Sequence, residues 1–263
     1  LKFEGIERNE EVMKRCGTQI IYLKDEAGEL LDFVAYGAFS PDILRRLKDH
    51  HDIVSKCKPM TRGGQFDCYG DGSMIAHGSS LPSGGAPGSA YAPVANFDAN
   101  TLEAMDIIFN EIEASPDTAV MQTAQRLLHP KAWRELKEQT QAADKMGRTG
   151  VNTYKCTGFC APEHSDPDEC RGLCACFDWY ALAWEYAFCQ PSYGYYLHTY
   201  ENMLWSFDSR RIHGTMLPSS IALPPRPSST GEMPTNGNRV SNGKHLTATS
   251  KNVAKAKKYQ AAR

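Results

Sequence analysis

The chain has 263 residues, 41% of them hydrophobic, which allows a sizeable core in one large domain or two small ones. We see no secretory signal in these residues and no apolar run near the roughly 20 residues of a membrane helix, so we do not expect a membrane-spanning protein. The net charge is −2, and the nine cysteines are expected to be reduced thiols in the cytosol or nucleus.

Two strands and a helix are predicted near the start. Residues 18–25 (TQIIYLKD) and 30–39 (LLDFVAYGAF) indicate a strand pair with a turn at Gly28. In residues 40–54, Ser40 is a capping residue followed by Pro41, which is typical of the start of a helix.

The middle of the chain changes character twice. Residues 62–93 are rich in Gly, Ser and Pro and predict a long loop, either functional or disordered. Apolar residues then recur at helical spacing in three segments separated by prolines. These segments are residues 100–114, 117–129 and 131–147.

After Gly150 the pattern favours β structure. Short aromatic and β-branched runs with turn residues between them suggest a sandwich or barrel. The runs are residues 151–160, 172–184, 186–200, 202–214 and 219–225. We therefore expect one domain over residues 1–227, with a helical and loop-rich support in 1–150 and a β core in 151–227.

Residues 228–263 are expected to form a disordered tail, because they are too polar to pack. From Arg239 to Arg263 there are seven Lys/Arg and no Asp/Glu, which leaves 22 basic and 31 acidic residues, a net charge of −9, elsewhere. Such a division favours contact between the tail and a polyanion. A solvated tail that only keeps the protein soluble is the alternative.

A possible metal site begins in the stretch PEHSDPDEC, where His164 and Asp166 are two residues apart. In a strand such a pair points to one face. A neutral imidazole and a carboxylate suit a divalent first-row metal, and a third ligand would complete a facial triad with three open positions. His213, 47 residues after Asp166, is the candidate third ligand. The alternative is an ordinary surface turn around His164.

The stretch from Tyr154 to Arg226, somewhat over a quarter of the chain, resembles the core of the TET/J-binding-protein family of oxygenases, and its fungal members most. The family pattern has H-x-D, a hydrophobic strand, an aromatic element leading into P-x-hydrophobic-G, and a strand ending near HG. Here FCQPSYGYYL fits the middle element and HGT the last. One departure is ALAWEYAF, which lacks the glycines usual before the middle element.

The resemblance implies an α+β domain in which helices pack around a double-stranded β-helix (jelly-roll) core. It implies a dioxygenase that uses Fe(II), 2-oxoglutarate and O2. Its metal ligands would be His164, Asp166 and His213. Arg226 would anchor 2-oxoglutarate, because arginine pairs bidentately with a carboxylate; a solvent-facing role at the edge of the tail is its alternative. Asp168, or Glu169, would contact the base.

The resemblance also implies a substrate and a location. The substrate would be 5-methylcytosine in DNA, flipped out of the duplex and oxidised to 5-hydroxymethylcytosine and further products. We expect a nuclear protein, monomeric and without membrane contact. Four tail lysines are candidates for phosphate contacts, and four aromatic residues either stack on bases or belong to the core. These are Lys251, Lys255, Lys257 and Lys258, and Trp179, Tyr180, Trp184 and Tyr186.

Three alternatives remain open from the sequence. The first keeps the chemistry but changes the substrate to N6-methyladenine, another methylated base, or a protein side chain. The second is a zinc-stabilised, non-enzymatic nucleic-acid-binding module. Its ligands would come from Cys156, Cys160, Cys170, Cys174 and Cys176, although two of these share a strand face and could be core. The third is an inactive family member that only binds DNA.

Overall fold

The computed structural model describes residues 3–54, 73–80, 92–93, 116–144, 152–161, 163–166, 170–179, 181–216 and 238–244. Arg226, Asp168, Glu169 and the four tail lysines lie outside these ranges, as do the predicted helix 100–114 and the predicted strand 219–225. None of the helices described is long and apolar enough to cross a membrane.

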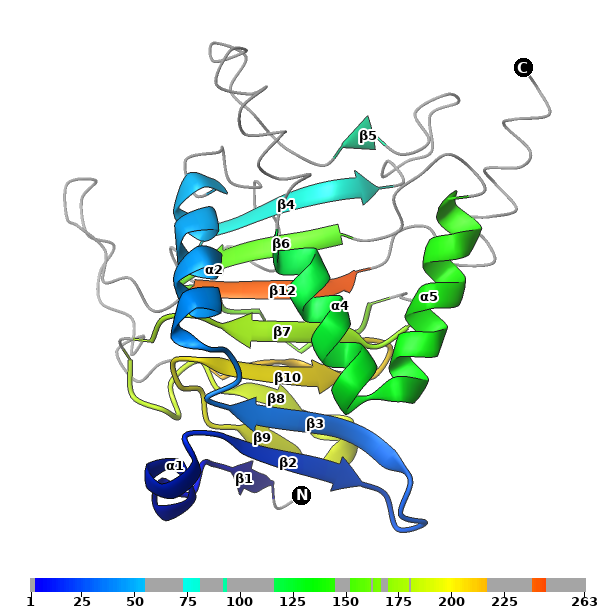
Figure 1. The fold of residues 1–263 in the computed structure, drawn as a ribbon. Coiled ribbons are helices and arrows are strands. Elements are labelled where there is room, and N and C mark those ends of the chain that lie inside the picture. The colour runs from blue at the N-terminus through cyan, green and yellow to red at the C-terminus, as the bar shows by residue number, and fades with distance from the viewer. Residues whose placement is uncertain are drawn as a thin grey trace, which may run out of the picture.

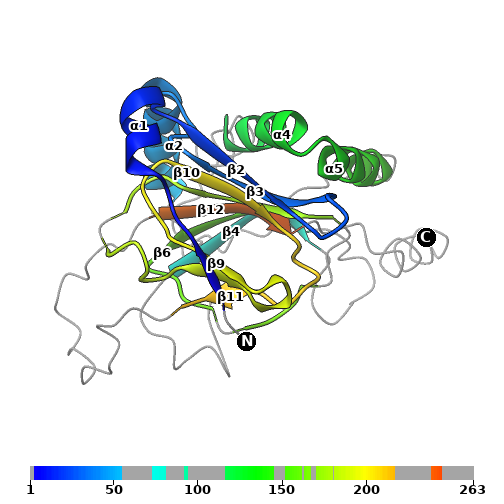
Figure 2. The same cartoon turned by 90° about the horizontal axis from the view of Figure 1, so that it is seen from below.

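Two sheets stack face to face, and helices cover the outer face of the larger one (Figures 1 and 2). The larger sheet has the order β2-β3-β10-β7-β12-β6-β4-β5. Its strands are β2 (Gln19–Lys24), β3 (Leu30–Tyr36), β4 (Ser73–Ser80), β5 (Ala92–Pro93), β6 (Asn152–Thr157), β7 (Gly172–Cys176), β10 (Met203–Phe207) and β12 (Asn238–Lys244). The smaller sheet has the order β1-β9-β8-β11, with β1 (Glu4–Ile6), β8 (Phe188–Gln190), β9 (Tyr195–Leu197) and β11 (Gly214–Thr215).

The helices are α1 (Glu10–Cys16), α2 (Pro41–Val54), α4 (Pro116–Leu128) and α5 (Pro130–Asp144), and a 3-10 turn spans Pro191–Tyr193. Helices α2, α4 and α5 form a layer over the larger sheet, as Figure 2 shows. His129 joins α5 to this sheet: its Nδ1 accepts from the Ala132 amide at 3.3 Å, so its Nε2 donates to the Leu31 carbonyl at 3.2 Å.

Strand alternation sends side chains into two separate cores. On β3, Phe33 and Ala35 face the helix layer, whereas Val34 and Tyr36 face the smaller sheet. Strands β7 and β10 alternate in the same way. Because both faces of these central strands are covered, their sequences read as nearly continuous apolar runs, and the space between the two sheets becomes the interior of a barrel-like core.

Several predicted elements are confirmed. Strands β2 and β3 pair antiparallel, and Gly28, at φ +82°, donates its amide to the Asp25 carbonyl at 2.9 Å in the turn. Helix α2 begins at Pro41, and Ser40 Oγ accepts from the Ile43 amide at 3.4 Å. Pro130 separates α4 from α5, as expected, and Pro116 and Pro130 also begin these helices, since proline suits the first helical position.

Two expectations are wrong in part. The predicted loop 62–93 contains β4, which pairs antiparallel with β6. The tail expected to be disordered contains β12, which lies between β6 and β7, so the domain does not end at residue 227. In both segments neighbouring strands supply backbone hydrogen bonds from either side. Those bonds do not depend on side-chain polarity, so composition was a poor guide.

Candidate metal centre

Backbone pairing brings the H-x-D segment and His213 together. The His164 amide donates to the His213 carbonyl at 2.9 Å, and the His213 amide donates to the His164 carbonyl at 2.8 Å. The Asp166 amide donates to the Ser209 carbonyl at 2.8 Å. One short backbone ladder therefore closes the long gap in sequence and fixes which side chains meet.

The three side chains converge on one point. One ligand atom from each of His164, Asp166 and His213 lies within 4.8 Å of the others. Asp166 Oδ2 is 3.9 Å from His164 Nε2 and 3.6 Å from His213 Nε2. Ligand bonds of about 2.0–2.2 Å would bring these atoms to roughly 3 Å from one another. The site is thus within a small side-chain adjustment of metal-binding geometry.

The ring of His213 is held in one orientation and one tautomer. Its Nδ1 lies 2.9 Å from the Arg211 carbonyl, which can only accept, so Nδ1 carries the proton. The lone pair of Nε2 is then left facing Asp166. Phe207 and Phe188 pack against the imidazole, with centroids at 4.9 and 6.0 Å. Only 6% of the side chain is exposed, so His213 is prearranged as a ligand.

A cavity of about 90 Å³ opens beside the three residues, between the two sheets. Its walls are mainly apolar and aromatic. They comprise Met74, Tyr154, Cys156, Phe159, Ala161, His164, Asp166, Cys174, Phe188, Trp205, Phe207, His213, Gly214 and Thr215. A small molecule bound there would lie beside the three side chains, against mainly apolar walls.

One polar atom in this wall lacks a partner. Trp205 is 1% exposed, and its Nε1 has no hydrogen-bond acceptor among the residues that the structure describes. Leaving a buried donor unsatisfied costs about 1–3 kcal/mol, and such donors are rare in native proteins. The indole N–H is itself covered, so a ligand in the cavity would reach this donor only after a small movement of the ring.

Gly214, directly after His213, is needed for close packing. A Cβ at this position would lie 3.2 Å from the Ala161 carbonyl oxygen and 3.2 Å from the backbone of Glu163. Strand β11 therefore passes tightly over the segment that leads into His164. In the HG pair, His213 is a candidate metal ligand. Gly214 has no Cβ, and this lets β11 lie close to the backbone of Ala161 and Glu163.

The remaining predicted residues divide into three groups. Arg226, Asp168 and Tyr180 lie outside the described residues, so their roles stay predictions. Trp179 and Tyr186 pack edge to face at 6.0 Å and so belong to the protein's own packing, whereas Trp184 is exposed. The cysteines Cys156, Cys160, Cys170, Cys174 and Cys176 are buried.

Cys174 and Cys176 lie in the core between the sheets, as one interpretation of the sequence expected. Across the described part of the chain, the triad is the one group of three or more His, Cys, Asp or Glu side chains with ligand atoms close enough to share an ion. The cysteines described there form no such group, so the zinc alternative finds no site among them.

Sequence reasoning did not identify Phe188, Phe207 and Trp205 as parts of the site. They appear in the sequence as ordinary strand aromatics, and only the packing of the two sheets places them beside His213 and the cavity.

Comparison with known proteins supports the fold. No family model matches the chain, and no curated protein matches it. Among solved structures, NgTET1 in complex with 5mC DNA is similar, with a TM-score of 0.52 and 10% identity over 87% of this chain and 77% of that one. An oxidoreductase of the 2OG-Fe(II) oxygenase family from Burkholderia pseudomallei gives a TM-score of 0.44 and 11% identity over 95% of this chain and 100% of that one. The likeness to NgTET1 is one of fold, and it confirms the predicted α+β architecture with a jelly-roll core and packed helices.

Proposed function

We propose that this protein is an Fe(II)- and 2-oxoglutarate-dependent dioxygenase that oxidises a methylated base in DNA, with 5-methylcytosine as the favoured substrate. The observation that carries the proposal is the convergence of His164, Asp166 and His213 at the wall of a cavity inside a jelly-roll core. No other group of described residues offers comparable chemistry.

The donor set fits the metal. Two imidazoles and one carboxylate on adjoining backbone segments form a facial triad, the arrangement typical of non-haem Fe(II) oxygenases. Bound iron would supply oxidation of a C–H bond, coupled to decarboxylation of 2-oxoglutarate. The residues of the chain would hold the ion through His164 Nε2, Asp166 Oδ2 and His213 Nε2, while Phe188 and Phe207 keep water from the His213 side.

The cavity fits a small co-substrate with carboxylate groups. After a small movement of the indole ring, the buried and unsatisfied Trp205 N–H would donate to an oxygen of 2-oxoglutarate, which would relieve the cost of its burial. Thr215, whose hydroxyl accepts from the Ala161 amide at 2.8 Å, adds a polar group to the wall. Arg226, as implied by the family resemblance, would pair with the distal carboxylate.

The substrate assignment rests on the family resemblance and on NgTET1, which was solved with 5mC DNA. A methyl group on a stacked base cannot reach a cavity between two sheets, so the base would have to leave the duplex, at roughly a few kcal/mol. Lysines of the basic tail would offset that cost through phosphate contacts. Because the proposed substrate is a base in DNA, we also propose a nuclear location.

The proposal is tested by mass spectrometry of nucleosides after incubating the protein with methylated DNA, Fe(II), 2-oxoglutarate and ascorbate. We expect 5-hydroxymethylcytosine and matching amounts of succinate. Both should vanish without 2-oxoglutarate and in His213→Ala, but persist in His198→Ala, which removes a histidine paired with Glu7 away from the site. Succinate with loss of N6-methyladenine instead would redirect the substrate assignment. Equal products from wild type and His213→Ala would refute the proposal.

A further inference from the structure

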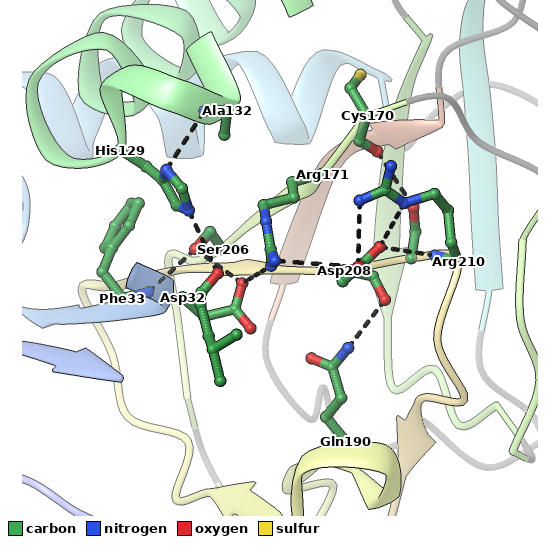
Figure 3. Close-up of polar contacts among 12 residues, drawn as sticks. Asp32, Phe33, His129, Ala132, Cys170, Arg171, Gln190, Ser206, Asp208 and Arg210 are labelled. Atoms are coloured by element: carbon green, nitrogen blue, oxygen red, sulfur yellow. Dashed lines mark hydrogen bonds and ion pairs between the residues drawn. The ribbon is translucent and has the colours of Figure 1, made fainter. Parts of the chain in front are cut away.

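A chain of ion pairs, most of them buried, adjoins the loop that leads into His213; Figure 3 shows its contacts. It consists of Asp32 on β3, Arg171 just before β7, and Asp208 and Arg210 in the loop between β10 and β11. We call these four residues the ion-pair network. Asp32 is fully buried, and the side chain of Arg171 is 11% exposed.

The loop of residues 208–213 carries or supports all three candidate ligands. Its Ser209 carbonyl accepts from the Asp166 amide, its Arg211 carbonyl accepts from His213 Nδ1, and His213 itself pairs with His164. A shift of this loop would therefore move the ligands relative to one another. What holds the loop also sets the geometry of the metal centre.

Asp208 anchors the start of that loop. Its carboxylate accepts from Arg210 Nε at 2.7 Å and Nη2 at 3.2 Å, and its main-chain carbonyl accepts from Gln190 Nε2 at 2.8 Å and from the Arg211 amide at 3.0 Å. Arg210 belongs to the same loop and its side chain is 44% exposed, so it braces the loop only locally. Fixed points outside the loop come from Gln190, from Cys170, whose carbonyl accepts from Ser209 Oγ at 3.3 Å, and from Arg171.

Arg171 supplies such a fixed point by joining two carboxylates. Its Nη1 lies 2.6 Å from Asp32 Oδ1, and its Nη2 lies 3.9 Å from Asp208 Oδ2. Asp32 is in turn held by the Tyr195 hydroxyl at 3.0 Å and the Ser206 hydroxyl at 3.3 Å. Figure 3 shows Arg171 lying between the two aspartates, so the loop is tied to β3 deep in the larger sheet.

The network is a costly way to gain stability alone. Each buried charge carries a desolvation penalty of several kcal/mol, and apolar residues of similar size often stabilise a core as well or better. Arg171, however, is one cation shared by two carboxylates, with a hydrogen bond to Asp32 and a charge contact of 3.9 Å to Asp208. Such a network is suited to fixing the position of the 208–213 loop, on which the arrangement of the candidate ligands depends.

We infer that Arg171 is a positioning residue for the metal centre: by joining Asp208 to Asp32, it holds the 208–213 loop where Asp166 and His213 can bind the same ion. The inference rests on the metal-binding part of the proposed function and is independent of the substrate. Replacing residues that hydrogen-bond to metal ligands typically changes metal affinity by about 10–100-fold, and Arg171 acts one contact further out, through the loop.

The test is Co(II) titration of the full chain, followed by visible absorption, with folding followed by circular dichroism. Arg171→Met with Asp32→Asn removes the guanidinium without leaving a buried carboxylate unpaired at Asp32. Arg171→Lys keeps the charge but loses the guanidinium. We expect both to stay folded, to bind Co(II) at least about tenfold more weakly, and to show an altered Co(II) spectrum. Arg45→Met, which breaks an exposed pair with Asp49, should match wild type.

The outcomes separate the inference from the proposed function. In one outcome, wild type binds one Co(II), His213→Ala does not, and both Arg171 variants bind Co(II) with the affinity and spectrum of wild type. Arg171 would then have only a structural role, and the inference would be overturned. If the double variant does not fold, the Arg171→Lys result decides. If wild type shows no Co(II) binding that depends on His213, the metal proposal itself fails, and the inference fails with it.

Discussion

On the face of the larger sheet that meets the helices, Phe33, Leu173 and Leu204 pack with Leu47 and Met121 into a closed apolar core. The opposite face meets the smaller sheet, and there the same strands border the cavity, His213 and the buried carboxylate of Asp32. One set of strands thus has a face that is filled and a face that is left partly open. Both faces carry a buried apolar core, but the candidate chemistry is confined to the face toward the smaller sheet.

The largest effect is expected on the helix face. Leu204→Ala should lower the free energy of unfolding by about 2–5 kcal/mol, because it leaves a cavity in a packed core. Urea unfolding measures this, and Ile20→Ala, at an exposed position of β2, is the control. Metal affinity should stay unchanged in Leu204→Ala at temperatures where the protein is folded. A parallel loss of metal affinity would break the distinction between the two faces.

A pH effect is expected from the other face. Burial raises the pKa of Asp32 from 3.8 to about 7, outweighing the neighbouring Arg171 guanidinium. Near pH 7 the folded state therefore holds Asp32 both ionised, as the ion pair with Arg171, and protonated. The stability that protonation contributes is fully present below about pH 4 and is lost as the pH rises through 7. Relative to Asp32→Asn, wild-type stability should fall by up to about 4 kcal/mol over that window. A flat difference between pH 4 and 8 would mean that Asp32 stays ionised.

Two glycine substitutions sharpen the comparison at a smaller scale. Gly214→Ala should weaken metal binding about tenfold, roughly 1.4 kcal/mol, because the new Cβ presses on the backbone before His164. Gly28→Ala should lower stability by about 1–2 kcal/mol through its positive φ, without changing metal affinity. Calorimetric titration and thermal unfolding of both variants measure the two effects. Gly214→Ala with wild-type metal affinity would show that the crossing of β11 tolerates a methyl group.

The smallest effect is expected at Trp205. Trp205→Phe keeps an aromatic ring but removes the N–H, so the KM for 2-oxoglutarate should rise about five- to tenfold with kcat nearly unchanged. In ¹⁵N-labelled protein, the indole signal missing from this variant should be the one that shifts when 2-oxoglutarate binds. Trp179→Phe, whose Nε1 already donates to the Leu182 carbonyl, is the control. An indole signal of Trp205 that ignores 2-oxoglutarate would remove it from the co-substrate site.

Local sequence patterns predicted what depends on local chemistry. The Ser40–Pro41 start of α2, the Gly28 turn and the alternating strands all follow from rules that act over a few residues. The triad was found through its residue types and spacing, helped by a family resemblance. The pairing of Asp32 with Arg171, 139 residues apart, has no local signature, and neither does the orphaned N–H of Trp205. Strand β12 was missed because its partners, and not its own composition, make it a strand.

The central claim is that His164, Asp166 and His213 bind a single ion. Anaerobic calorimetric titration with Fe(II) tests it most directly, on wild type, on alanine variants of each of the three residues, and on His198→Ala as the control. We predict one Fe(II) per chain in wild type and His198→Ala, and at least a hundredfold weaker binding in each of the three variants. Retention of one tightly bound Fe(II) by His213→Ala would contradict the account.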